Sequence, residues 1–254
     1  MSEGQLHLLH TRPDARLLAA WVARHHARHE RQVSDLGNAL HGLLRAAFGQ
    51  AAPQPFRYLD EERGLLAYTS LNAEEMSAQV ALADPLAAQT LGLGACAGHE
   101  GYRLRAFPTR WLAGQVLEFE VRVRPTVRGA KGEQDAFLHA VSQAQSEPLQ
   151  REAVYAQWLH DHLAARNGAS REDWQGAVDL EQVWLAGYQR LAIVRRSQAP
   201  RGEARQAHVI DGPDALLRGR LRVLDPTAFA RLLARGVGRH RSFGFGMLLL
   251  SRPC

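Results

Sequence analysis

The feature that most constrains this chain is the glycine-rich segment GVGRHRSFGFG at residues 236–246. Four glycines fall within eleven residues, directly after an amphipathic stretch typical of a helix and directly before the apolar run MLLL. Glycines at this density indicate positive φ angles or the close approach of another backbone. We therefore expect a helix and a final strand to be joined through a tight, crowded turn.

Cationic residues lie between these glycines, so the turn combines backbone N–H groups with positive side chains. That combination suits a phosphate chain. The candidate phosphate contacts are Gly236, Gly238, Arg239, His240, Arg241, Ser242 and Gly244. The segment is neither a Walker loop, since no Gly-Lys-Ser/Thr follows, nor a dinucleotide fingerprint, since the strand follows the turn. A tight connection with solvated arginines stays open as the alternative.

Charge is distributed unevenly along the 254 residues. The formal net charge is +5, and 30 of the 31 basic residues are arginines, a bias that a GC-rich genome would also produce. Residues 189–254, however, hold 13 arginines against four acidic residues, which leaves the rest of the chain net negative. Such segregation favours a surface for polyanions, because arginine forks onto phosphate and stacks on bases. Nucleic acid is the expected partner, with candidate contacts at Arg195, Arg196, Arg201, Arg205, Arg218 and Arg220.

Hydrophobic periodicity gives the same order of elements in both halves, β-α-β-β-α-β. The order predicts an α+β fold of tandem ferredoxin-like (RRM-like) domains, with an extra N-terminal helical insertion rich in Arg and His near residues 16–31. The expected domains are residues 1–113 and 114–254. A second helix is predicted over residues 36–48, helices over 133–145 and 151–166, and strands near 178–184, 190–195 and 218–224.

Several classes of protein are disfavoured by composition. No apolar run approaches the roughly 20 residues of a membrane-spanning helix, and no secretion signal is evident. The only cysteines, Cys96 and Cys254, cannot build a disulfide scaffold or a four-cysteine zinc site, so we expect a reducing, cytoplasmic location. His25 and His29 have a zinc-binding spacing, but no suitably placed glutamate or cysteine pair completes a site. No metal or other cofactor is expected.

The glycine segment resembles that of the CRISPR repeat-processing endoribonucleases of the RAMP superfamily. These carry G-x-G-x-x-x-x-x-G-x-G before a final apolar strand, and Gly236, Gly238, Gly244 and Gly246 match it position for position. LHGLLRAAF (40–48), VRVRPTVRG (121–129) and YAQWLHDHL (155–163) are also similar to the type I-E form. Asn38 stands where relatives often have a tyrosine, and arginines replace their lysines, which points to a divergent member or the type IV counterpart.

The resemblance implies a metal-independent enzyme that binds the repeat stem-loop, cuts precursor crRNA by 2′-hydroxyl attack and leaves a 2′,3′-cyclic phosphate. It also implies that the enzyme stays on its product, with other effector-complex subunits as partners. His41 matches the family's N-terminal histidine and would act as acid or base. We expect Arg24, Arg28 and Arg31, on one helix face, to crowd the scissile phosphate.

Other interpretations stay open at this point. The departures at Asn38 and at the lysines favour, modestly, a non-catalytic crRNA-binding subunit. His41 could be a packing residue, and the three arginines a solvated face or a grip on the stem-loop. A small-molecule enzyme lacks clustered carboxylates or a cofactor motif. We expect Phe243 and Phe245 to pack in a core and His160 and His162 to be surface residues.

Overall fold

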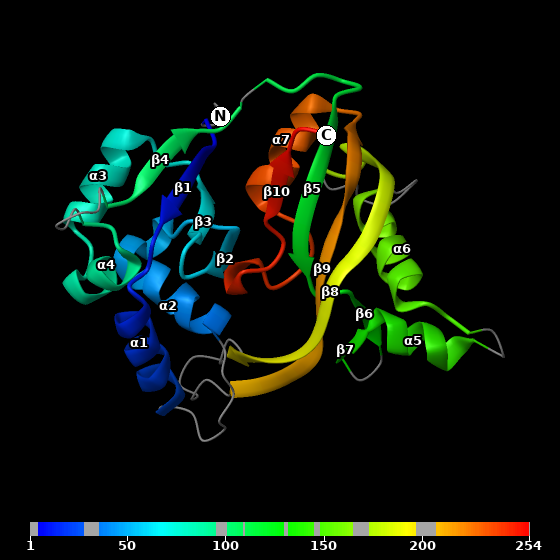
Figure 1. The fold of residues 1–254 in the computed structure, drawn as a ribbon, viewed down its shortest axis with the longest axis horizontal. Helices are drawn as coiled ribbons and strands as arrows, with labels where there is room; N and C mark the ends of the chain where they lie inside the picture. The colour runs from blue at the N-terminus through cyan, green and yellow to red at the C-terminus, as the bar shows by residue number, and fades with distance from the viewer. Residues whose placement is uncertain are drawn as a thin grey trace.

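The computed structural model describes residues 5–27, 36–94, 101–108, 110–129, 132–144, 148–164, 173–196 and 207–253. The N-terminal half runs as β1 (His7–Thr11), α1 (Ala15–Ala27), α2 (Leu36–Phe48), η1 (Gly49–Ala51), β2 (Phe56–Asp60), β3 (Gly64–Thr69), α3 (Ala73–Ala81), α4 (Pro85–Leu91) and β4 (Arg103–Ala106) (Figure 1). The C-terminal half runs as β5 (Val116–Val123), β6 (Thr126–Gly129), β7 (Gly132–Asp135), α5 (Ala136–Gln143), α6 (Arg151–Leu163), β8 (Val178–Arg196), β9 (Ala207–Val223), α7 (Pro226–Arg235), η2 (Arg241–Phe243) and β10 (Leu248–Ser251).

Two four-stranded antiparallel sheets form the frame of the molecule. The first has the order β2-β3-β1-β4 and the second has the order β10-β5-β9-β8. Counted within its own half, each sheet places its strands as 4-1-3-2, with the first and third strands in the centre. This arrangement confirms the predicted tandem ferredoxin-like fold. The division at residue 113 stays a prediction.

Each sheet covers its own hydrophobic core. In the first, α2 buries the stripe of Leu40, Leu43, Leu44 and Phe48, as its helical spacing predicts. In the second, the alternation of β5 sends every other side chain into the core, where β9, α6 and α7 meet it. None of the described helices is both long and apolar enough to cross a bilayer.

Three predicted elements differ from the structure. Residues 132–135 form strand β7, paired with β6, so the predicted helix over 133–145 begins only at Ala136, where the Asp135 side chain accepts the Phe137 N–H at 2.8 Å. The two short strands near 178–184 and 190–195 are the single strand β8. Its partner β9 begins at Ala207, well before the predicted 218. Before Ala215, β9 pairs only with β8, so this part of the ribbon needs no apolar alternation and hydrophobic periodicity did not reveal its full length.

The two halves meet along β3 and β10. The buried Tyr68 hydroxyl donates to the carbonyl oxygen of Leu248 at 2.8 Å. An aromatic row continues from Tyr68 through Phe107 and Trp111 to Phe229, with ring centroids 4.9, 6.0 and 5.0 Å apart. Residues of both sheets therefore share one packed boundary.

We predict that Tyr68→Phe lowers the free energy of unfolding by about 1 kcal/mol, because it removes one buried hydrogen bond and leaves the Leu248 carbonyl with fewer donors. Chemical denaturation followed by circular dichroism measures the change. Tyr58→Phe, at a half-buried position on β2, is the matched control. Equal effects of the two changes would show that the hydroxyl of Tyr68 does not stabilise the boundary.

Candidate nucleic-acid interface at the glycine loop

Residues 236–246, here called the glycine loop, close on themselves and attach to β5. The Val237 N–H donates to the Gly246 carbonyl at 2.8 Å, and the Gly246 N–H donates to the Arg122 carbonyl at 2.7 Å. Gly236, Gly238, Gly244 and Gly246 all have positive φ, between 74° and 82°. A Cβ atom on Gly246 would overlap the Val237 carbonyl oxygen, so this position requires glycine.

The glycine loop also packs against the start of α2, from the other half of the chain. A Cβ atom on Gly37 would overlap the carbonyl oxygen of Phe243, so helix and loop touch through their backbones. One turn further along α2, the His41 ring meets the Phe243 ring edge-on, with centroids 5.7 Å apart. The structure thus places His41 beside the glycine loop, although the two are about 200 residues apart in sequence.

A groove of about 580 Å³, here called the domain groove, opens between α2, β2, β5, β8, β9 and the glycine loop. The hydrophobic side chains of Leu40 and Phe243 line part of the groove. Its polar groups come from Arg57, Arg122, Gln189 and Asp214. Residues of both ferredoxin-like halves line it.

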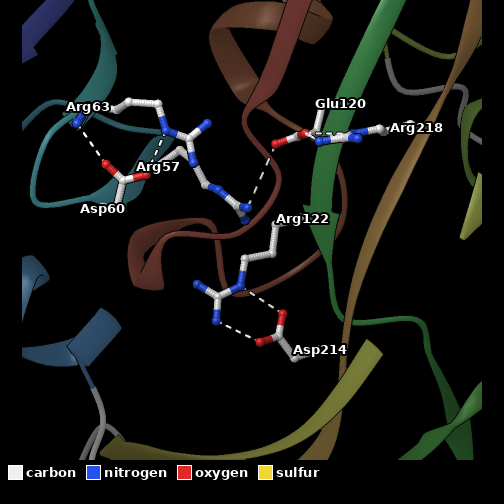
Figure 2. A network of polar contacts seen from close by, with 7 residues as sticks. All are labelled: Arg57, Asp60, Arg63, Glu120, Arg122, Asp214 and Arg218. Atoms are coloured by element: carbon white, nitrogen blue, oxygen red, sulfur yellow. Dashed lines mark hydrogen bonds and ion pairs between the residues drawn. The ribbon is translucent and has the colours of Figure 1, made fainter. Parts of the chain in front are cut away.

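Ion pairs organise the arginines around this groove (Figure 2). Arg122 binds Asp214 through two hydrogen bonds of 2.7 Å, and Gln189 donates to the same carboxylate at 2.7 Å. Burial favours protonation of Asp214, but the bonds from Arg122 outweigh it and hold the pKa of Asp214 below its ordinary value. Both donors reach the carboxylate from neighbouring strands, so the Arg122 side chain is fixed at the groove wall.

Arg57, on β2, is the most strongly desolvated cation of the groove. Burial, reinforced by the charge of Arg122, lowers the pKa of Arg57 to about 10. Its guanidinium lies 3.8 Å from Glu120, which also binds Arg218 at 2.8 Å. Glu120 therefore links an arginine of the first half to one of the second (Figure 2).

His41 is half-buried, and burial, followed by the nearby charge of Arg45, lowers its pKa below the ordinary value of 6.5. At neutral pH the imidazole is therefore mainly neutral and able to accept a proton.

The far side of the glycine loop is held by Glu133 of β7. Arg239 donates to Glu133 at 2.7 Å, and the His240 ring bonds the other carboxylate oxygen at 2.9 Å. The hydrogen bond with His240 is the main cause that lowers the pKa of Glu133 to about 2. His240 has a φ of 61°, a left-handed conformation that is uncommon for a residue with a side chain. Glu133 thus holds the loop in a strained turn.

Two expectations are corrected here. The predicted free amides of the loop are partly engaged, since the N–H groups of Val237, Gly238, Phe243 and Gly246 all have acceptors within the chain. His162 is half-buried rather than a free surface residue: it accepts the Gly238 N–H at 3.1 Å and stacks on Trp158, with centroids 5.3 Å apart and planes 5° apart.

A family model described as "CRISPR associated protein" matches residues 8–252. The chain belongs to this CRISPR-associated family. Among solved structures, it is similar to the CRISPR endoribonuclease Cse3 bound to 19-nucleotide RNA, at 18% identity and a TM-score of 0.58 over 98% of this chain and 100% of that one. Thermus thermophilus Cse3, bound to an RNA representing a pre-cleavage complex, matches at 19% identity and a TM-score of 0.55 over 97% and 99%. No curated protein sequence matches.

The structure brings only some of the predicted site residues to the glycine loop. Arg218 and Arg220 lie on β9 and pair with Glu120 and Glu118, at 2.8 and 3.9 Å, so part of the local positive charge is neutralised. Arg241 donates to the carbonyl oxygen of Arg235 at 2.8 Å, and Ser242 is half-buried in η2.

Arg24 is exposed on α1. Trp21, three residues earlier, attaches this helix to α2, because its indole N–H donates to the Ala39 carbonyl at 3.2 Å. Arg195 and Arg196 end strand β8, but their side chains lie outside the described part of the chain. The remaining predicted positions are outside the described residues, namely Arg28, Arg31, Arg201 and Arg205.

Sequence reasoning missed the partners that hold the site, namely Arg57, Arg122, Arg124, Glu133 and Asp214. The alternation in VRVRP placed Arg122 on a polar strand face and was the one available signal. The acidic partners carried no local signal, because Glu133 and Asp214 lie about 100 residues from the cations they bind.

We predict that Glu133→Gln destabilises the protein by about 2 kcal/mol at pH 7, the order expected for losing charge-assisted hydrogen bonds. A carboxylate with a lowered pKa contributes stability above its unfolded pKa, near 4.5, and loses it as the pH falls towards 2. The difference in melting temperature between wild type and variant should therefore shrink from pH 7 to pH 3. Glu62→Gln, in an exposed turn, is the control. A difference that stays constant across this range would contradict the assignment.

Proposed function

We propose that this chain is a metal-independent endoribonuclease that binds the stem-loop of CRISPR repeat RNA and cuts the precursor into crRNA. It leaves a 2′,3′-cyclic phosphate and stays bound to its product. The observation that carries the proposal is the position of His41 against Phe243 of the glycine loop, beside an arginine-lined groove between two ferredoxin-like domains. Membership of the CRISPR-associated family and the fold shared with RNA-bound Cse3 support it.

The chemistry needs one proton acceptor and a stabiliser of negative charge. The 2′-oxygen forms a bond to phosphorus while the bond from phosphorus to the 5′-oxygen breaks. His41, neutral because of its lowered pKa, takes the proton of the 2′-hydroxyl, and water protonates the departing 5′-oxygen. Arg24, Arg28 and Arg31 stabilise the charge that develops on the phosphorane oxygens.

Stem-loop binding is assigned to the second half of the chain. The β8–β9 ribbon extends past the sheet and carries Arg195, Arg196, Arg201 and Arg205 at and beyond its paired end. A-form RNA offers phosphates and 2′-hydroxyls more readily than base edges, so arginines on a ribbon suit its backbone. The loop residues Gly236, Gly238, Arg239, His240, Arg241, Ser242 and Gly244, with Arg218 and Arg220, complete the proposed contact surface.

A non-catalytic crRNA-binding subunit is the second candidate. It is favoured by Asn38, where relatives often have a tyrosine, and by the engagement of Arg218, Arg239 and Arg241 within the protein. The CRISPR RNA-guided surveillance complex, which contains a chain similar to this one at 17% identity and a TM-score of 0.51 over 97% of this chain and 100% of that one, supports a role in an assembly. We propose other effector-complex subunits as partners in either case.

We predict that purified protein cleaves its repeat RNA in EDTA and that His41→Ala slows single-turnover cleavage by about 10²–10⁴, the usual contribution of a general base. Binding of an uncut stem-loop should change little. Gel analysis of end-labelled RNA measures both the rate and the cyclic end. His160→Ala, on the exposed face of α6, is the control. Uncut RNA held by wild type would favour the binding subunit, and wild-type cleavage by His41→Ala would exclude its role.

The pH dependence should follow the lowered pKa of His41. A base must be neutral, so cleavage at subsaturating RNA should rise with pH, with the midpoint of the rise below about 6.5, the ordinary value for histidine. The rise should be absent in the residual activity of His41→Ala. A rate that instead falls as the pH increases through this range would mean that His41 acts as the acid.

A further inference from the structure

A second concave site borders the glycine loop at residues other than those that line the domain groove. This back pocket, about 390 Å³, lies between the end of β5, β6, α6 and the loop. Its polar and aromatic lining consists of Arg124, Arg128, Trp158, His162 and Arg239, with Asp161 at the rim. Nothing in the proposed cleavage chemistry uses it.

One buried ring, that of Phe245, lies near an arginine of each cavity. Arg122 lies over Phe245 with its guanidinium carbon 4.6 Å from the ring centroid, and Arg124 lies 5.7 Å from the same centroid. Arg122 lines the domain groove and Arg124 lines the back pocket. The glycine loop contributes Phe243 to the groove and Gly238 to the pocket, so both cavities border the same loop.

The charge of the back pocket favours an anion. Three guanidinium groups and one carboxylate line the pocket, and Asp161 is 65% exposed and therefore well solvated. Glu133 neutralises part of the charge of Arg239, which leaves the pocket net positive. The Arg128 side chain is exposed and forms no ion pair with any residue in the described part of the chain. Arg239 stays 55% exposed although it binds Glu133. Both cations can therefore reach a phosphate at the pocket mouth.

The aromatic wall favours a nucleobase. Trp158 and His162 are stacked nearly parallel, and the Trp158 indole N–H is already bound to the Thr126 carbonyl at 3.1 Å, which fixes the ring. Fixed aromatic rings beside arginines are the usual means of holding unpaired nucleotides. A pocket at the lower end of the range for small ligands has room for one nucleotide but not for a helical stem.

We propose that the back pocket binds one unpaired nucleotide of the RNA strand that adjoins the stem-loop, with Arg128 and Arg239 at its phosphate and the Trp158–His162 pair against its base. This inference rests on the proposed function, because the RNA must first be held at the groove. It gives the protein a means to distinguish a stem-loop within a longer transcript from an isolated one.

The test compares two non-cleavable RNAs, each with a 2′-deoxynucleotide at the cut site. One is the bare repeat stem-loop and the other carries unpaired nucleotides on both sides. Fluorescence anisotropy measures their affinities for wild type, for Arg128→Ala and for Arg252→Ala, an exposed arginine after β10. The flanks should strengthen binding to wild type and Arg252→Ala by about tenfold, within the range for one stacked base. Arg128→Ala should lose most of that gain and keep its affinity for the bare stem-loop.

Two results would overturn the back-pocket proposal alone: flanks that add nothing to wild-type binding, or an Arg128→Ala defect that is equal for both RNAs. The second would show that Arg128 only adds general positive charge. If wild type binds neither RNA, the proposed function itself fails and the inference falls with it. Unchanged melting temperatures of both variants confirm that the comparison involves folded protein.

Discussion

The site depends on the two guanidinium groups, of Arg122 and Arg124, that lie near the buried Phe245 ring. Arg122 is fixed by Asp214, and Arg124 donates to the carbonyl oxygens of Leu191 and Ile210 at 2.9 and 3.2 Å. Since buried charge is tolerated only when it is hydrogen-bonded, these contacts allow few alternative positions for either arginine. The glycine loop, the end of β5 and the root of the β8–β9 ribbon are thereby held together.

This arrangement explains why glycine is required well outside the loop. A Cβ atom on Gly212, in β9, would lie 2.6 Å from Nη2 of Arg124. The ribbon can approach Arg124 only because that position lacks a side chain. The ribbon proposed to contact RNA is therefore held at its base by the same arginine that lies near Phe245 of the glycine loop.

Local patterns predicted the parts of the fold that local physics decides. The apolar stripe of α2, the alternation of β5 and the glycine spacing each reflect one element packing on one core, and each is present in the structure. The pairing of Glu133 with His240 and of Asp214 with Arg122 joins residues that are 107 and 92 positions apart, and no periodicity encodes such contacts. The arginine excess predicted a free positive surface, but several of its members, such as Arg218 and Arg222, are paired with glutamates across the sheet. The full length of the ribbon was missed, although strands near 178–184 and 190–195 were predicted, because its backbone pairing needs no hydrophobic face.

The proposed function requires RNA to lie between the two ferredoxin-like halves, with the cut phosphate beside His41 and the glycine loop. The most direct test is photocrosslinking of a non-cleavable repeat RNA that carries 4-thiouridine next to the cut site, followed by mass spectrometry of the attached peptides. We predict attachment within residues 36–48 or 236–246. Attachment confined to the outer helices α5 or α3, away from the domain groove, would contradict the account.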